Sequence, residues 1–314
     1  MKILNLVDLA KSDIKYKISK FPDGQQNITI INMDREWHNA INGKGPFHIP
    51  NYEIQIKSRL NNFRDLEIII AAVACLRELE VKEIHLFAPY FVGARSDRKF
   101  EEGGNWYLKQ VICPIINSLN FTSVTVLDAH SSVLGNLLNN FKGIDNYKLL
   151  EFGLSQIFFN KPYKDISIKN HFNDFILVSP DAGASHKIYK LAEAIGYKGD
   201  IITCSKERDI EGKLTRTVVP FNIKNVENKD FIIIDDICDG GRTFINIADN
   251  IKQNGLTKNK IYLIVTHGIF SAGFSELNKY FDGIYCTNSY LDIGDKAMIN
   301  GELQITNVTQ LNVF

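Results

Sequence analysis

Short runs of Ile, Val and Leu alternate along the chain with longer segments in which apolar residues recur every three or four positions. This alternation predicts an α/β fold, in which helices flank a mainly parallel sheet. The predicted strands are residues 83–90, 123–129, 175–181, 200–205, 231–236, 260–268 and 283–289. The predicted helices are residues 65–80, 106–120, 185–196 and 243–255.

The two halves of the chain resemble each other. The segments "VTVLDAHSSVLGNLL" and "FIIIDDICDGGRTFINIA" both run from an apolar strand through an acidic residue and a loop of small residues into a helix. We therefore predict two similar α/β domains, residues 1–149 and 150–314. Residues 35–60 break the alternation, and we interpret them as an insertion or a long loop.

Composition excludes several classes of protein. The 314 residues include 36 Lys and Arg against 36 Asp and Glu, so the formal net charge is zero, which argues against a nucleic-acid or membrane-surface binder. The five Cys have no CxxC spacing, which indicates reduced, mostly buried thiols. Because we find neither a signal peptide nor an apolar stretch of membrane-spanning length, we expect a cytoplasmic protein, or one in the host cytoplasm if the chain is viral.

The clearest chemical signal is the glycine-containing turn of residues 239–243, which follows a predicted strand and opens a predicted helix. Backbone N–H groups in such a turn converge on an anion, and the helix dipole favours negative charge there. Asp235 and Asp236 repel a phosphate, but they suit the vicinal hydroxyls of a sugar or a Mg²⁺ held through water. The combination indicates a ribose phosphate, although a simple helix N-terminus beside two acids is the alternative.

The segment "FIIIDDICDGGRT" resembles the ribose-phosphate motif of phosphoribosyltransferases and of ribose-phosphate pyrophosphokinases. The second family is similar over nearly the whole chain, because its short motifs recur in order. These are "FPDGQ" (21–25), "PYFVGARSDRK" (89–99), "LDAHSS" (127–132), "VSPDAG" (178–183), "SKER" (205–208) and "THGIFS" (266–271). The resemblance implies two tandem phosphoribosyltransferase-like domains, the first with ATP-binding elements and the second with the ribose-phosphate turn and a catalytic loop.

The same resemblance implies an activity and a set of residues. A pyrophosphokinase of this family transfers the β,γ-diphosphate of Mg-ATP to the C1 hydroxyl of ribose 5-phosphate and releases AMP. The implied catalytic residues are Lys206 and Arg208. The implied metal-linked residues are His130, Asp181 and Asp128. The implied ATP-binding residues are Phe21, Asp23, Gln25, Arg95, Ser96 and Asp97. The implied ribose-phosphate residues are Asp235, Asp236, Asp239, Gly240, Gly241, Arg242 and Thr243.

The family's partners follow in the same way. Phe21, Asp23 and Gln25 match a loop that covers the adenine of a neighbouring subunit, so the resemblance implies a homo-oligomer, at least a dimer, that acts on small molecules. No nucleic-acid or membrane partner is expected. Phe21 as an ordinary core residue, and Lys206 and Arg208 as a solvated surface pair, are the alternatives.

Several positions depart from the family pattern. Ser96 replaces a Gln, and Gln25 replaces a Glu, which alters the hydrogen bonds available to a purine. In the turn, the usual form is Asp-Thr-x-Gly-Thr, so Gly240 removes a hydroxyl and its bulk, while Arg242 adds a forked cation. A roomier, more positive turn suits a phosphate that is esterified onward.

The altered turn makes ADP-ribose the second candidate acceptor. Such turns resemble those of phage-type relatives, some of which convert ADP-ribose to its 1-diphosphate for NAD synthesis. Aromatic residues of the insertion, Trp37, His38, Phe47 and Tyr52, would stack on a second adenine or simply pack within a surface loop. A phosphoribosyltransferase is a further alternative, but it leaves "SKER", "LDAHSS" and "PYFVGARSDRK" without a purpose. A non-catalytic regulatory subunit is the last alternative, and the retention of Lys206, Arg208, His130 and Asp181 argues against it.

Overall fold

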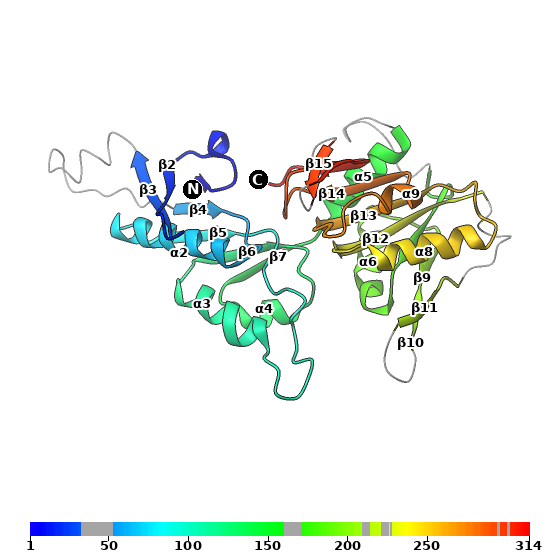
Figure 1. Ribbon diagram of the computed structural model, residues 1–314, viewed down its shortest axis with the longest axis horizontal. Helices are drawn as coiled ribbons and strands as arrows, with labels where there is room; N and C mark the ends of the chain where they lie inside the picture. Colours follow the sequence, from blue (N-terminus) through cyan, green and yellow to red (C-terminus); the bar gives the residue numbers. More distant parts are fainter. Residues whose placement is uncertain are drawn as a thin grey trace. The chain divides into compact units, whose positions relative to one another are not determined.

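The computed structural model describes residues 1–32, 53–159, 171–208, 214–220, 226, 228–293, 296–299 and 302–314. Contacts divide the chain into two compact units (Figure 1): unit 1 comprises Met1–Asp145 with Phe314, and unit 2 comprises Asn146–Val313. The division lies just before helix α5 (Tyr147–Phe159), whereas the boundary drawn from the sequence, 149/150, lies inside that helix.

Unit 1 contains a parallel five-stranded sheet with the order β1-β4-β5-β6-β7. The strands are β1 (Lys2–Asn5), β4 (Glu53–Lys57), β5 (Glu83–Phe87), β6 (Ser123–Leu127) and β7 (Phe141–Ile144). A short 3₁₀ helix, η1 (Leu9–Lys11), precedes an antiparallel hairpin, β2 (Lys15–Lys20) and β3 (Gln26–Asn32). The strands of this sheet therefore follow one another in space in the same order as in the sequence.

One face of this sheet forms the core of unit 1. The helices are α2 (Phe63–Glu78), a π-helical turn η2 (Leu108–Ile112) that continues into α3 (Cys113–Ser118), and α4 (Val133–Leu137). Ile54, Ile56, Ile84 and Leu86 alternate with polar residues along β4 and β5 and pack into one cluster with side chains of these helices. The opposite face of β4 and β5 is mostly polar, and it carries Glu53, Gln55, Lys57, Glu83 and His85 beside Phe87.

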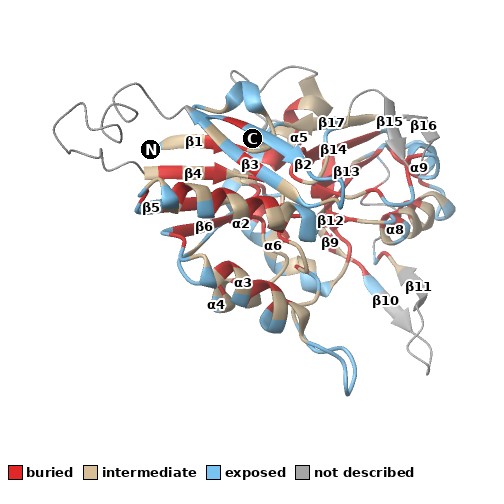
Figure 2. Cartoon of the chain, turned by 60° about the vertical axis from the view of Figure 1, so that its left-hand side comes forward, coloured by how far each residue is buried: buried red, intermediate tan, exposed pale blue. Residues whose placement is uncertain are grey.

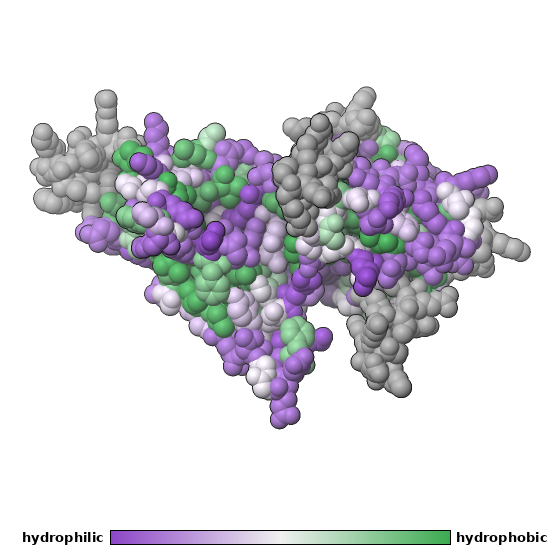
Figure 3. Space-filling model, in the orientation of Figure 1, coloured by the Kyte–Doolittle hydropathy of each residue, from purple (hydrophilic) through white to green (hydrophobic). Residues whose placement is uncertain are grey.

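Apolar side chains are also exposed on unit 1. On the face seen in Figure 3, they gather near α2 and α3, whereas the side chains over α8 of unit 2 are mostly hydrophilic. Phe63 and Ile70 of α2 are 50% and 38% exposed.

Unit 2 contains a parallel six-stranded sheet with the order β17-β14-β13-β12-β8-β9. The strands are β8 (Phe175–Ser179), β9 (Ile201–Thr203), β12 (Asp230–Cys238), β13 (Ile261–Gly268), β14 (Gly283–Thr287) and β17 (Val308–Leu311). Two hairpins accompany the sheet: β10 (Ser205–Arg208) with β11 (Leu214–Val218), and β15 (Lys296–Ile299) with β16 (Glu302–Ile305).

Helices cover both faces of this second sheet. Helices α8 (Arg242–Gln253) and α9 (Leu277–Tyr280) contribute to the core on one face, and α5 and α6 (Ala182–Ile195) to the core on the other. Strands β8, β13 and β14 are therefore buried along their whole length, and Figure 2 shows β13 and β14 mostly red. This is why their sequences are continuous apolar runs rather than alternating ones.

The α/β class with parallel sheets flanked by helices is confirmed, and one prediction about the fold was wrong. Residues 53–57, inside the segment taken for an insertion, form β4, which pairs with β1 on one side and β5 on the other. Residues 33–52, including the aromatic residues named above, lie outside the described residues. All five cysteines lie in the described part of the chain and form no disulfide, and four of them are buried. Among the described residues, every helix is too short or too polar to cross a membrane.

Candidate ribose-phosphate site

The order of the strands locates a topological switch point in unit 2. After β8 the chain passes through α6 to β9 on one side, and after β12 it passes through α8 to β13 on the other side. The loops that follow β8 and β12 therefore lead to opposite faces, which makes the space between the carboxyl ends of these two strands the topological switch point of the sheet. Open α/β sheets bind ligands at this position.

The turn of residues 239–243 lies at this switch point. Strand β12 ends at Cys238 and α8 begins at Arg242, with Gly241 as the cap residue at φ 77°. A Cβ at Gly241 would lie 2.9 Å from Cδ2 of Leu277, so both the backbone conformation and the space require glycine. Because glycine offers no capping side chain, the first N–H groups of α8 can receive an external anion.

Neighbouring loops hold this turn in place. The Ser271 hydroxyl donates to Oδ1 of Asp239 at 2.5 Å, and the Ser271 N–H donates to the Asp239 carbonyl at 3.2 Å. At Gly240, by contrast, a Cβ would meet no atom closer than 3.9 Å. The turn is therefore fixed on the side of Ser271 and open beside Gly240, while Arg242 is exposed and Thr243 is half-buried.

Asp235 and Asp236 stand on β12, immediately before the turn. Asp236 is 4% exposed, and Nζ of Lys187 on α6 lies 3.4 Å from its Oδ2. The backbone N–H of Asp236 donates to Oδ1 of Asp235 at 2.9 Å. Burial, together with the charges of Asp236 and Asp181, raises the pKa of Asp235 well above its ordinary value. The three acids are thus close enough to repel one another.

Asp181 contributes from the other side of the switch point. It is the N-cap of α6, where its Oδ1 accepts from the backbone N–H of Ala184 at 3.0 Å. The Ser179 hydroxyl donates to the Asp181 carbonyl at 2.8 Å, which fixes the start of the loop. The oxygen-rich group formed by Asp181, Asp235 and Asp236 suits a hard cation or the hydroxyls of a sugar.

We expect the Asp235→Asn substitution to stabilise the ligand-free protein at pH 8. The pKa of Asp235 is higher in the folded than in the unfolded protein, so the protonated carboxyl is the form that favours folding. As the pH rises through the folded-state pKa, the carboxyl ionises in its buried position and the free energy of unfolding decreases. The amide removes the penalty of the buried charge, so the gain in melting temperature over the parent should shrink as pH falls towards 4. Thermal denaturation without divalent metal measures this gain. Asp249→Asn, on α8 of the same unit, is the control, and an equal melting temperature of Asp235→Asn and parent at pH 8 would contradict the expectation.

Lys206 and Arg208 lie on β10 of the β10–β11 hairpin. The backbone of Lys206 pairs with Thr217 and that of Arg208 with Leu214, with an irregularity between Glu207 and Arg208. Their side chains lie outside the described part of the structure. The segment of "SKER" is therefore placed on a hairpin that follows β9, and the assignment of its two cations to catalysis stays a prediction.

The predicted ATP-binding residues lie in unit 1, in two separate loops. Phe21–Gln25 form the loop of the β2–β3 hairpin, which the Phe21 N–H closes by donating to the Gln25 carbonyl at 2.9 Å. The Gln25 N–H donates to Oδ1 of Asp23 at 3.0 Å, and Phe21 is 51% exposed. This exposure argues against the interpretation of Phe21 as a core residue.

The second loop follows β5 and carries Arg95, Ser96 and Asp97. Arg95 is exposed, and the N–H of Ser96 donates to the Gly93 carbonyl at 2.8 Å. This loop is joined to the last residue of β6, because the Leu127 N–H donates to the Pro89 carbonyl at 3.1 Å.

Asp128 and His130 occupy the loop after β6. Asp128 is 8% exposed, adopts a left-handed backbone with φ 43°, and its N–H donates to the Ile144 carbonyl at 2.7 Å. His130 is half-buried in the same loop. Both residues belong to unit 1, whereas Asp181 belongs to unit 2, so their proposed joint role in binding metal stays a prediction.

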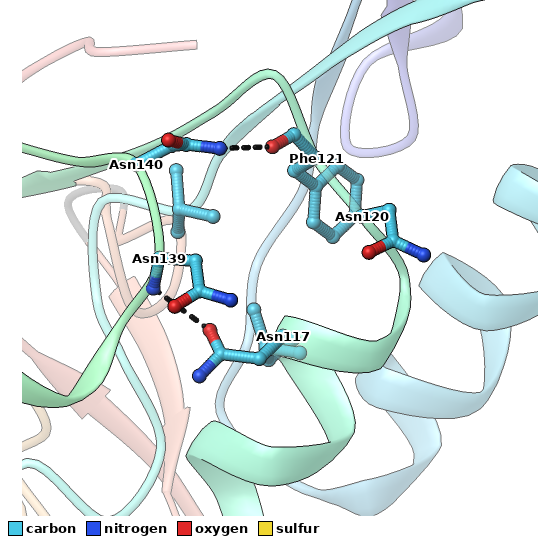
Figure 4. A pocket seen from close by; sticks show the side chains of 7 residues that line it. Asn117, Asn120, Phe121, Asn139 and Asn140 are labelled. Atoms are coloured by element: carbon cyan, nitrogen blue, oxygen red, sulfur yellow. Dashed lines mark hydrogen bonds between the residues drawn. The ribbon is translucent and has the colours of Figure 1, made fainter.

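Two other features of the structure do not belong to the predicted site. His267 is 3% exposed and its Nδ1 lies 2.8 Å from the Ser289 hydroxyl, as expected of a packed core histidine. An open pocket of about 120 Å³ lies in unit 1 between the end of α3, the start of β6 and the residues before β7, and several asparagines line it (Figure 4). The amides of Asn117 and Asn140 bind the carbonyls of Leu137 and Phe121, so these side chains serve the local fold.

Sequence reasoning missed two residues of the site. No contact had been predicted for Lys187, and Ser271 had been noted only as part of "THGIFS". Both act through partners distant in the sequence, Asp236 and Asp239, so the sequence pattern alone carried no signal for the pairing.

Comparisons with known proteins identify similar chains. Residues 187–290 match the family model described as the phosphoribosyl synthetase-associated domain. A ribose-phosphate pyrophosphokinase of Mycoplasmopsis pulmonis is 30% identical over 231 residues, which cover 73% of this chain and 65% of that relative's length. Ribose-phosphate pyrophosphokinase 2 of Saccharomyces cerevisiae is 28% identical over 248 residues, covering 77% and 71%. The crystal structure of phosphoribosylpyrophosphate synthetase from Mycobacterium smegmatis shares the fold, with a TM-score of 0.73, 16% identity and coverage of 97% of this chain and 88% of that chain.

Proposed function

The chain belongs to the ribose-phosphate pyrophosphokinase family, and from this premise we propose that it transfers the β,γ-diphosphate of Mg-ATP to the C1 hydroxyl of a 5-phosphorylated ribose and releases AMP. Ribose 5-phosphate is the acceptor we favour. The observation that carries the proposal is the turn of residues 239–243 at the switch point of unit 2, with the acid pair of β12 directly before it.

Each part of the acceptor has a partner in unit 2. The 5-phosphate binds the N–H groups at the start of α8, with the Thr243 hydroxyl as a further donor. The ribose diol donates hydrogen bonds to the carboxylates of Asp235 and Asp236, and Lys187 holds Asp236 in place. The sugar is thereby oriented with its C1 hydroxyl free to react.

Charge on the transferred diphosphate requires positive groups. We assign this role to Lys206 and Arg208, whose contacts strengthen as charge develops on the leaving and attacking oxygens. The oxygen-rich acids Asp181, Asp235 and Asp236 fit Mg²⁺, and the family resemblance adds His130 and Asp128. When bound, Mg²⁺ supplies neutralisation of the phosphate oxygens.

The nucleotide is assigned to unit 1. Arg95, Ser96 and Asp97 contact its phosphates and sugar, and the exposed Phe21 covers the adenine of a neighbouring copy, with Asp23 and Gln25 at the base edge. We therefore propose a homo-oligomer of at least two copies. The exposed apolar side chains near α2 in Figure 3 are consistent with a surface that another copy covers.

The activity is tested by incubating the protein with Mg-ATP and ribose 5-phosphate and following AMP release and product mass. AMP together with a product that carries a diphosphate on C1 supports the proposal. Release of pyrophosphate from added phosphoribosyl diphosphate and a base, without AMP formation from ATP, would instead identify a phosphoribosyltransferase. If folded protein released no AMP with either ribose 5-phosphate or ADP-ribose, that result would point to a non-catalytic regulatory subunit.

ADP-ribose is the second candidate acceptor, and the open space beside Gly240 favours it. A Cβ there would meet no atom within 3.9 Å, so a phosphate that continues into a second phosphate has room that the usual Thr would fill. The exposed Arg242 supplies a forked donor for the additional charge.

We expect Gly240→Thr to shift the acceptor preference towards ribose 5-phosphate. The added hydroxyl gives the terminal phosphate another donor, while its bulk obstructs an esterified phosphate, so the ratio of kcat/KM for ribose 5-phosphate over ADP-ribose should rise about tenfold or more. Parallel AMP-release assays with the two acceptors measure the ratio. An unchanged ratio in a variant with the parent's melting temperature would remove the basis for the ADP-ribose candidate.

A further inference from the structure

A group of three potential metal ligands lies in unit 1, away from the loops just described. Glu53 begins β4, Glu83 begins β5, and His85 lies two residues further along β5. Glu53 and Glu83 are register partners on neighbouring parallel strands, so all three side chains lie on the polar face of the sheet. One ligand atom from each residue lies within 4.8 Å of the others. We call this group the Glu53–Glu83–His85 cluster.

The histidine of the cluster is already positioned as a ligand. His85 is 7% exposed, and its Nδ1 lies 2.7 Å from the Ser123 hydroxyl on β6. Its buried Nε2 makes no aligned hydrogen bond, although Oε1 of Glu53 lies 3.0 Å away. Histidines that bind metals have this arrangement, in which a partner on one nitrogen orients the ring and leaves the other to the ion.

The two carboxylates supply negative charge to the cluster. The N-terminal ammonium of Met1 lies 3.9 Å from Oε2 of Glu53, beyond hydrogen-bond distance. Glu53 is half-buried and Glu83 is exposed, so an ion can enter from solvent and both side chains can rotate to meet it. Ligands of a tetrahedral ion at ~2.1 Å stand about 3.4 Å apart, which a small rotation from the present spacing achieves.

We propose that the Glu53–Glu83–His85 cluster binds a divalent transition metal, Zn²⁺ in the first instance. One imidazole with two carboxylates is a nitrogen and oxygen donor set that suits Zn²⁺ better than Mg²⁺, which takes oxygen ligands only. Three protein ligands leave a fourth position for water. The ion would tie together the first residues of β4 and β5.

This site is distinct from the proposed catalytic metal. The cluster lies at the amino ends of β4 and β5, whereas the loops that carry Arg95 and His130 follow the carboxyl ends of β5 and β6. The two ends of a strand are separated by the length of that strand, so one ion cannot bind both the cluster and the proposed catalytic site.

Titration of the metal-stripped full chain with Zn²⁺ tests the proposal. By calorimetry, we expect one equivalent of Zn²⁺ to bind to the parent and to be lost in His85→Gln and in Glu83→Gln. The second variant alters an exposed side chain, so its folding is not at risk. Removing the orienting hydroxyl, Ser123→Ala, should weaken binding about 10- to 100-fold. In the NMR spectrum of the ¹⁵N-labelled parent, Zn²⁺ should shift the Nε2 resonance of His85.

Two matched variants separate this site from other zinc-binding groups. His171→Gln removes another histidine with a carboxylate partner, since His171 Nδ1 lies 2.7 Å from Oδ2 of Asp174 in unit 2. His130→Ala removes the histidine assigned to the catalytic metal. Both should keep the equivalent that His85→Gln loses. Absence of Zn²⁺ binding to the parent, or equal stoichiometry and affinity in Glu83→Gln and parent, would overturn the proposal.

Discussion

The Lys206→Ala variant is expected to turn over about 10²- to 10³-fold more slowly than the parent, with little change in its affinity for ATP. Lys206 belongs to the hairpin that follows β9, and we assign its charge to the diphosphate that moves between the two substrates. Charge on that group increases as the bond to the leaving oxygen breaks. An interaction that strengthens only in the transition state contributes to kcat and not to binding of the substrate.

Two measurements on the same preparation separate the effect on rate from the effect on ATP affinity. The first is AMP formation in a single turnover, and the second is equilibrium binding of a non-hydrolysable ATP analogue. Lys198→Ala is the matched control, because this exposed lysine of unit 2 lies before β9 and outside the assigned site. It should keep both the rate and the affinity. If Lys206→Ala lost binding and rate by the same factor, the role assigned to Lys206 would be wrong, because uniform loss marks a contact made equally in the ground state.

The central strands of unit 2 were predictable because they are buried on both faces, whereas the edge strand β17, which is half-buried, was not predicted. The buried strands are continuous apolar runs, and β8, β12, β13 and β14 were all found from that pattern, with ends shifted by a few residues. The helix of residues 106–120 was found as well, but it opens with a π-helical turn before α3. Pro114 has no N–H for the usual helical hydrogen bond, which accounts for the π-helical turn. The spacing of apolar residues gives no sign of such an irregularity.

The sequence pattern failed where strands are only half-buried. In β4, Ile54 and Ile56 alternate with Glu53, Gln55 and Lys57, so no apolar run marks the strand. Its alternation over five residues was the available signal, and it was hidden by the polar segment that precedes it. The β2–β3 hairpin was missed for the same reason, since β2 buries only Tyr16.

In the candidate site, the features formed by contiguous residues were predicted, whereas the contacts between distant segments were not. The turn and the acid pair are contiguous in the sequence, and they were predicted together because the strand, the turn and the helix are consecutive segments of the chain. The proximity of Asp181 to Asp235, and of Lys187 to Asp236, depends on β8 pairing with β12. That pairing joins segments more than fifty residues apart, so it had to come from the fold.

The second large effect is expected at Gly241, where Gly241→Val should abolish measurable binding of ribose 5-phosphate. A left-handed backbone at φ 77° costs a residue with a branched Cβ about 1–3 kcal/mol. The new Cβ would also lie 2.9 Å from Cδ2 of the buried Leu277, so either that side chain or the turn must move. Because the N–H groups to which we assign the phosphate begin at this residue, movement of the turn would misdirect them. The melting temperature should fall by several degrees, and calorimetry should detect no acceptor binding.

Gly240→Ala is the matched control for stability, because it adds the same first carbon one residue earlier. Its Cβ meets no atom within 3.9 Å and its backbone lies outside the left-handed region, so its free energy of unfolding should stay within about 0.5 kcal/mol of the parent. Comparing Gly240→Ala with Gly241→Val shows whether the loss of stability comes from the backbone geometry at Gly241 or from adding any side chain to the turn. Unimpaired phosphate binding by Gly241→Val would show that the sugar phosphate lies elsewhere, since a cradle of backbone amides cannot survive displacement of its own cap residue.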